Sequence, residues 1–190
     1  MHAENEYELI QGREVLMSPA GAGHNLVVFN LAKTISNYLK GKRCKVRLDT
    51  FIRFDKDTIL APDISIFCSP FKVMNDIIEG IPDFVAEVLS PSTRKYDIGE
   101  KKTIYADYGV KEYWILDPKA QTIEIYLLRD GAYILSESYY NYSQGELDFL
   151  HRELHEKTKL SLKYPYMMIS RSISRTFLKN KENVSRETFS

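Results

Sequence analysis

The chain has 190 residues, of which 44% are hydrophobic and 27% charged, with 26 basic and 26 acidic side chains. This composition suits one globular domain, excludes disorder throughout, and gives no bulk electrostatic signature of a nucleic-acid partner. No apolar run approaches the ~20 residues that span a bilayer, and the first residues lack the apolar core of a secretion signal. We therefore expect a cytoplasmic protein with no membrane partner.

The first half of the chain predicts short strands around one long helix. Residues 7–18, YELIQGREVLMS, predict two strands around a Gln11-Gly12 turn. Apolar residues at helical spacing predict a helix from about His24 to Lys40. Further strands are predicted over residues 43–54, 63–67 and 83–89. The last two of these are apolar on both faces, which is typical of central strands.

The second half predicts one helix followed by three strands. The helix runs from about Tyr96 to Tyr108, and Gly109 ends it. The strands EYWILD, TIEIYLL and AYILSE follow it, separated by turns. The whole order predicts a mixed sheet with helices packed on its faces.

Two acidic residues stand out on the predicted central strands. Asp63 opens one strand, and Glu87 lies near the C-terminal end of another, on a face shared with Val85 and Leu89. A buried carboxylate is costly unless it is paired, solvated or bound to a cation. Each acid taken alone therefore has two interpretations, a structural acid at a strand end or a cation ligand in the cleft that forms there.

Lys101 lies in the apolar stripe of the second predicted helix, whereas Lys102 falls to its side. The stripe consists of Ile98, Ile104, Tyr105 and Tyr108. A lysine there needs an anionic partner, for which Glu87 is the natural candidate. The alternative is that the stem is buried and the ammonium reaches solvent.

Two carboxylates and a lysine fit metal-assisted hydrolysis of a phosphodiester. Carboxylate oxygens suit Mg²⁺ or Mn²⁺, which bind substrate phosphate while keeping several waters. We therefore predict Asp63 and Glu87 as metal ligands and Lys101 as a catalytic residue that orients water or neutralises phosphate charge.

These residues resemble the PD-(D/E)XK nuclease superfamily and, more narrowly, its bacterial Uma2 family. The resemblance covers roughly residues 5 to 150 and rests on YELIQGREVLMSP, APDISIF, DFVAEVLSPST and GVKEYWILDP. It implies an α/β (α+β) fold: a restriction-endonuclease-like mixed sheet flanked by helices, with additional antiparallel strands. It also implies an endonuclease that acts on DNA, with the Val88 carbonyl as a further metal ligand. The chain departs from the superfamily at Leu89, where a lysine is expected, and Lys101 takes that role.

Several other residues have two interpretations each. His24 begins the first helix, where it either assists catalysis at substrate phosphate or caps the helix. Asp97, Ser90 and Ser92 are interpreted as helix-entry residues, with Ser92 or Asp97 as the N-cap. The two cysteines, Cys44 and Cys68, are too few for a disulfide framework, and we interpret them as buried thiols.

We expect residues 1–160 to form the nuclease-like domain and residues 161–190 a poorly ordered basic tail. Residues 151–190 carry nine basic and four acidic side chains. Past about Lys163 the sequence departs from the family ending, and a frame shift of two nucleotides restores a family-like reading. We hypothesise a frameshift in the gene or its sequencing, which an intact reading frame on resequencing would refute.

Three functions stay open on the sequence. The first is the metal-dependent DNA endonuclease. The second is a catalytically inactive module that binds nucleic acid or a protein partner, which the neutral charge favours. The third is a generic α/β protein with structural acids, which leaves Lys101 unexplained. A homodimer is one option for the assembly, because many enzymes of this fold cut two strands as dimers.

Overall fold

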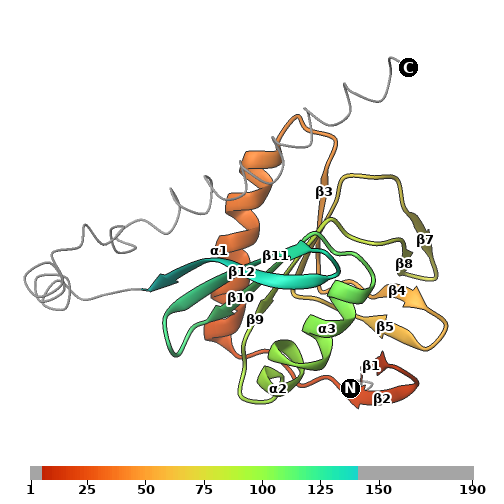
Figure 1. Ribbon diagram of the computed structural model, residues 1–190, viewed down its shortest axis with the longest axis horizontal. Helices are drawn as coiled ribbons and strands as arrows, with labels where there is room; N and C mark the ends of the chain where they lie inside the picture. The colour runs from red at the N-terminus through yellow and green to blue at the C-terminus, as the bar shows by residue number, and fades with distance from the viewer. Residues whose placement is uncertain (1–5, 141–190) are drawn as a thin grey trace, which may run out of the picture.

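The computed structural model describes residues 6–140 and is shown in Figure 1. The end of the predicted 1–160 domain, the tail over 161–190 and its frameshift hypothesis lie outside the described residues. Three helices and twelve strands form within 6–140. The helices are α1 (Ala22–Leu39), α2 (Arg94–Ile98) and α3 (Glu100–Asp107). No helix of this part of the chain is long and apolar enough to cross a membrane.

The first sheet is mixed and holds the centre of the molecule. Its strands are β3 (Lys45–Leu48), β6 (Ile64–Phe67), β9 (Phe84–Val88), β10 (Glu112–Asp117), β11 (Thr122–Arg129) and β12 (Ala132–Tyr140). They lie in the order β12-β11-β10-β9-β6-β3, with β9 parallel to β10 and the other neighbours antiparallel. This confirms the predicted mixed sheet.

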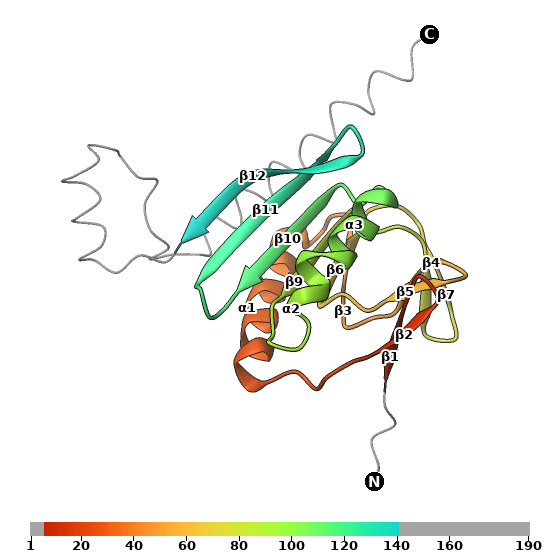
Figure 2. The same ribbon diagram turned by 60° about the horizontal axis from the view of Figure 1, so that its bottom comes forward.

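A second sheet forms beside the first, on the side where the chain begins (Figure 2). Its strands are β1 (Tyr7–Ile10), β2 (Arg13–Leu16), β4 (Ile52–Asp55), β5 (Thr58–Leu60), β7 (Lys72–Met74) and β8 (Ile77–Glu79). The order is β2-β1-β5-β4-β8-β7. The sequence did not predict β5, β7 or β8, because three residues are too few for alternation to show and all of β7 is exposed.

Apolar side chains pack on both faces of the first sheet. On one face α1 packs through Leu31 and Ile35 against Ala86 and Trp114. The opposite face packs against α3 and the second sheet, in a cluster that contains Val85, Leu89, Tyr105, Tyr113 and Leu60. Because successive residues of β9 alternate between these faces, Glu87 points to the side of α3.

The predicted helix over 96–108 is two helices, broken at Gly99. A Cβ atom at Gly99 would lie 2.9 Å from the backbone oxygen of Lys95, so this close turn accommodates only glycine without a shift. The break rotates α2 relative to the predicted stripe. Ile98 is therefore 48% exposed, so its predicted place in the buried stripe was wrong, whereas Asp97 is buried.

The start of α2 confirms Ser90 as a helix-entry residue but differs from the predicted N-cap. The Ser90 hydroxyl accepts the backbone N–H of Thr93 at 3.2 Å, and the Ser90 carbonyl accepts that of Arg94 at 3.0 Å. Ser90 therefore orders this entry, and neither Ser92 nor Asp97 is the N-cap.

The prediction of two free buried thiols was wrong as well. Cys44 and Cys68 form a disulfide across β3 and β6. Because Lys45 pairs with Phe67, the two cysteines occupy the next opposed position of this antiparallel pair. Spacing along the chain gave no sign of this contact, because it depends on the register between two strands.

Candidate active site

A cavity of about 950 Å³ opens between the two sheets, the start of α1 and the helices α2 and α3. All four catalytic residues predicted from the sequence line it. They are His24, Asp63, Glu87 and Lys101. They come from α1, the residue before β6, β9 and α3, so the fold brings together positions far apart in the sequence.

Asp63 and Glu87 meet where neighbouring strands β6 and β9 place them side by side. Ile64 pairs with Ala86 in this antiparallel register, so Asp63, the residue before Ile64, lies opposite Glu87. The backbone N–H of Asp63 donates to Glu87 Oε2 at 3.2 Å. The N–H of Val88 donates to Asp63 Oδ2 at 2.7 Å. The Glu87 carboxylate is thus held by the backbone N–H of Asp63, and the Asp63 carboxylate by the backbone N–H of the residue after Glu87.

The ammonium of Lys101 is enclosed by three carboxylates. Its Nζ lies 2.8 Å from Glu8 Oε1, 3.4 Å from Glu87 Oε1 and 3.5 Å from Asp97 Oδ1. Its side chain is 5% exposed, so the ammonium does not reach solvent. Burial disfavours the charge, but Glu87, Glu8 and Asp97 together raise the pKa of Lys101 above its ordinary value. The lysine therefore stays charged at neutral pH.

Leu89, where the superfamily pattern expects the lysine, is buried in the apolar cluster with Ile104 and Tyr105. Lys101 extends from α3 to Glu87 instead. Tyr105, one turn later, donates its hydroxyl to the same Glu87 Oε1 at 2.8 Å. The ammonium therefore reaches the carboxylate pair from a helix rather than from the strand.

Sequence reasoning missed Glu8 and misread Asp97. Glu8 shares a strand face with buried Ile10, but a four-residue strand leaves open which face is buried, and an acid is normally assigned to solvent. Asp97 lies four residues before Lys101, the spacing that pairs side chains on one helix face. That spacing was the available signal for Asp97.

Negative charge exceeds positive charge in this site. Burial raises the pKa of Glu87 well above its ordinary value; the charges of Asp97, Asp63 and Glu8 add to this, and Lys101 opposes it. Burial also raises the pKa of Asp97. Carboxylates crowded around one ammonium are the arrangement that an added cation would relieve.

Asp49 adds another acid at the cavity wall. It follows β3, lines the cavity and donates its backbone N–H to the Asp63 carbonyl at 3.4 Å. Burial and the neighbouring charge of Asp63 raise the pKa of its carboxyl. The negative field of the site thus extends along the turn that leads from β3 to β4.

His24 lies at the start of α1 with its ring against Asp63. Its Nε2 is 3.2 Å from Asp63 Oδ2, and its side chain is 13% exposed. The hydrogen bond with Asp63 raises the pKa of His24 above its ordinary value, although partial burial opposes this. The residue that the sequence associated with substrate phosphate or helix capping is therefore paired with a predicted metal ligand.

The carboxylate pair fits a hard divalent cation. Within residues 6–140 no three His, Cys, Asp or Glu side chains already converge as a complete ligand set. Mg²⁺ commonly takes only one or two carboxylates and keeps several waters. Asp63 is 15% exposed, and both Asp63 and Glu87 line the cavity, so the pair has carboxylate oxygens of the kind that such an ion binds.

The mixed sheet flanked by helices is a restriction-endonuclease-like fold. The chain belongs to the Uma2 family. The family model, described as "Putative restriction endonuclease", matches residues 1–161. The predicted fold and family are therefore confirmed.

The chain is also similar to one solved structure and to two sequence relatives. The solved structure is "a putative nuclease belonging to DUF820" from Anabaena variabilis; the TM-score is 0.63 at 22% identity, over 73% of this chain and 79% of that chain. One uncharacterised protein of Synechocystis sp. is 27% identical over 128 residues, which are 66% of this chain and 67% of the relative. Another from the same organism is 23% identical, covering 78% and 87%.

Proposed function

We propose that this protein is a Mg²⁺- or Mn²⁺-dependent endonuclease that hydrolyses phosphodiester bonds of DNA. The observation that carries the proposal is the pairing of Asp63 with Glu87 at the cavity wall, linked by a 3.2 Å hydrogen bond and accompanied by a buried lysine. The family description supports nuclease chemistry. The metal, the substrate and the residue roles are our proposal.

Asp63 and Glu87 would hold the cation, with the Val88 carbonyl as a proposed further ligand. When bound, the cation would supply Lewis-acid stabilisation of phosphate charge and a more acidic water. Glu87 is kept in place for this by Tyr105 and Lys101, which both donate to its Oε1. Lys101 adds a positive charge beside the carboxylates that is not lost at neutral pH.

His24 and the start of α1 would receive the substrate backbone. Ser18, Pro19 and Ala20, just before α1, line the cavity with His24. A helix N-terminus is electropositive and favours a phosphate. Because His24 Nε2 lies 3.2 Å from Asp63 Oδ2, a phosphate bound at the start of α1 would lie beside the proposed metal ligand.

A cleavage assay tests the proposal. Purified protein is incubated with supercoiled plasmid, linear DNA and RNA, each with EDTA, Mg²⁺ or Mn²⁺. The variants are Asp63→Asn, Glu87→Gln and Lys101→Met. The control is Glu112→Gln, because Glu112 is also a buried glutamate but lies away from the carboxylate pair. In the strand register Glu112 of β10 is opposite Phe84, which is three residues from Glu87 along β9. We expect metal-dependent DNA cleavage that falls by at least about 100-fold in both carboxylate variants and persists in the control.

Cleavage that survives both carboxylate substitutions would identify a contaminating nuclease and end the proposal. No cleavage but saturable DNA binding would favour the inactive binding module. Preferential cleavage of RNA would support the proposed phosphodiester hydrolysis but would show that the substrate is RNA rather than DNA. We also propose a homodimer, since cutting two strands is simplest with two sites; light scattering that gives a monomer with and without DNA would exclude it.

A further inference from the structure

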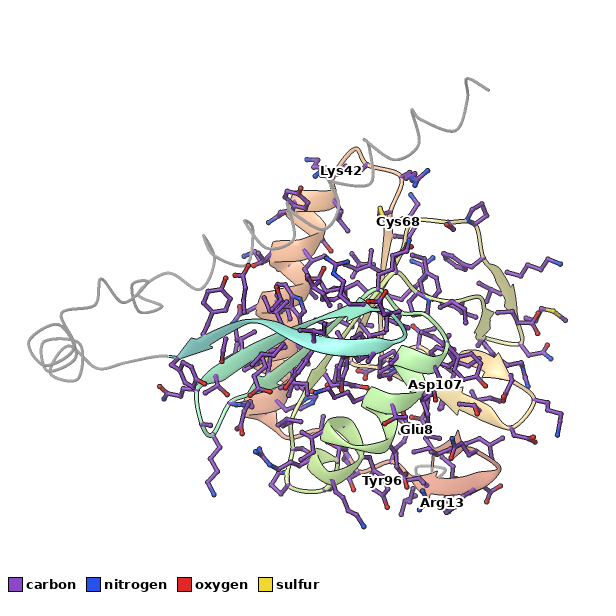
Figure 3. All side chains as sticks on the ribbon, in the orientation of Figure 1. Glu8, Arg13, Lys42, Cys68, Tyr96 and Asp107 are labelled. Carbon is purple, nitrogen blue, oxygen red and sulfur yellow. A yellow bond between two sulfur atoms is a disulfide. The ribbon has the colours of Figure 1, made fainter. Side chains whose placement is uncertain are left out.

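Glu8 lies closer to the Lys101 ammonium than either of the other carboxylates does. The distance from Lys101 Nζ to Glu8 Oε1 is 2.8 Å, against 3.4 Å to Glu87 Oε1. Glu8 is 5% exposed although it belongs to β1, near the start of the described chain. Figure 3 labels Glu8 where β1 approaches the helices. A buried glutamate thus joins the second sheet to the site.

The same Glu8 oxygen makes a second contact that leads to Asp63. Glu8 Oε1 accepts the backbone N–H of Ala61 at 2.8 Å. Ala61 begins the short segment between β5 and β6 that ends at Asp63. One carboxylate oxygen therefore fixes both the lysine and the backbone that delivers the first proposed metal ligand.

We propose that Glu8 is a positioning residue of the endonuclease site, which holds Lys101 in place while Glu87 and Asp63 bind the cation. The inference rests on the proposed function. A cation on Glu87 withdraws part of the negative charge that attracts Lys101, and the 3.4 Å contact between them is already long. The shorter Glu8 contact does not involve a proposed ligand, so it keeps the ammonium beside the pair in the loaded site.

Asp97 supports the lysine from the other side but does not replace Glu8. It lies four residues before Lys101, at 3.5 Å from Nζ, on a helix that Gly99 separates from α3. Without Glu8, the two nearest remaining anions would be Glu87 and Asp97. Lys101 would then move toward Glu87 and compete with the cation for its carboxylate.

The test compares Glu8→Gln with Glu112→Gln. Glutamine keeps the length of Glu8 and an oxygen that can accept the Ala61 N–H, but it removes the charge that faces Lys101. We expect Glu8→Gln to lower kcat by about 10- to 100-fold, which is the usual effect of losing a residue that orients groups around a metal site. The KM for DNA should be nearly unchanged. We also expect the thermal stabilisation by Mn²⁺ alone to require a higher Mn²⁺ concentration. Glu112→Gln should change neither quantity.

A double-mutant cycle with Lys101→Gln shows whether Glu8 acts through the lysine. If it does, adding Glu8→Gln to Lys101→Gln costs little further kcat. The Mn²⁺ titration of Glu8→Gln gives an independent measure, because it needs neither a folded lysine variant nor turnover.

Each result decides between the alternatives. If the wild-type protein cleaves DNA and Glu8→Gln matches it in kcat and in the Mn²⁺ titration, the proposed role of Glu8 is overturned. The proposed function then still stands. Fully additive losses in the cycle also overturn that role, because they show Glu8 acting independently of Lys101. Absence of cleavage by the wild-type protein with every metal and substrate overturns the proposed function, and the positioning role falls with it.

Discussion

Glu87 is a buried carboxylate whose charge works against folding, and we propose that it binds a cation. It is 3% exposed, and burial is the main cause that raises its pKa. Ionising such a group in the folded protein costs free energy, which a bound cation returns. A stable apoprotein would be served better by a neutral residue here, so keeping a carboxylate at this position is consistent with a site rather than with a structural acid.

Substituting Glu87 by Gln should therefore stabilise the protein without metal. The pKa of Glu87 is higher in the folded than in the unfolded chain, so the folded state binds the proton more tightly and wild-type stability falls as pH rises above about 4.5. In EDTA at pH 8 we expect Glu87→Gln to be more stable than wild type, with no gain at pH 4. Thermal unfolding measures both.

The same variant should lose the stabilisation that Mn²⁺ gives the wild-type protein. Glu14→Gln is the control, because Glu14 is exposed on β2. A Glu87→Gln protein that is less stable than wild type in EDTA at pH 8 would show that the pairing with Lys101 outweighs the cost of burial.

Among the elements, those with an unambiguous apolar pattern could be predicted and those set by tertiary contacts could not. The strands β6, β9 and β10 are buried throughout and mostly apolar, and they appear close to their expected bounds. The division between α2 and α3 was missed, because Gly99 alone does not show that a turn of helix will rotate there. Asp63, Glu87 and Lys101 were chosen from the sequence, whereas Glu8 needed the approach of the second sheet.

The break between α2 and α3 has a measurable consequence for stability. An alanine at Gly99 would place its Cβ 2.9 Å from the Lys95 carbonyl oxygen, so the backbone must shift. We expect Gly99→Ala to cost about 1–3 kcal/mol, the usual range for overpacking. Urea unfolding measures it, with Gly23→Ala as a control, because nothing lies within 4 Å of a Cβ at that position. Equal stability of Gly99→Ala and wild type would mean that a continuous helix is accessible.

At the scale of the whole molecule, the disulfide and the site occupy different ends of the fold. Figure 3 shows Cys68 far from Glu8. Cys44 precedes β3, whereas Asp49 at the cavity follows it. The bridge therefore links β3 to β6 without contributing side chains to the cavity.

Removing the bridge should lower stability and spare the site. The cysteines are separated by 24 residues in sequence, and closing a loop of that length contributes roughly 3 kcal/mol in the chain-entropy model. We expect Cys44→Ser with Cys68→Ser to lose about that much in urea unfolding and to become insensitive to a reducing agent. Wild-type stability that does not respond to the reducing agent would contradict this.

The location of Mn²⁺ in a crystal tests the central claim most directly. Anomalous diffraction from crystals soaked in Mn²⁺ should place a peak in contact with the carboxylates of Asp63 and Glu87, beside the cavity that Lys101 lines. The peak should disappear in Glu87→Gln crystals soaked in the same way. A protein that cleaves DNA with Mn²⁺ but shows no peak at these two carboxylates would contradict the account.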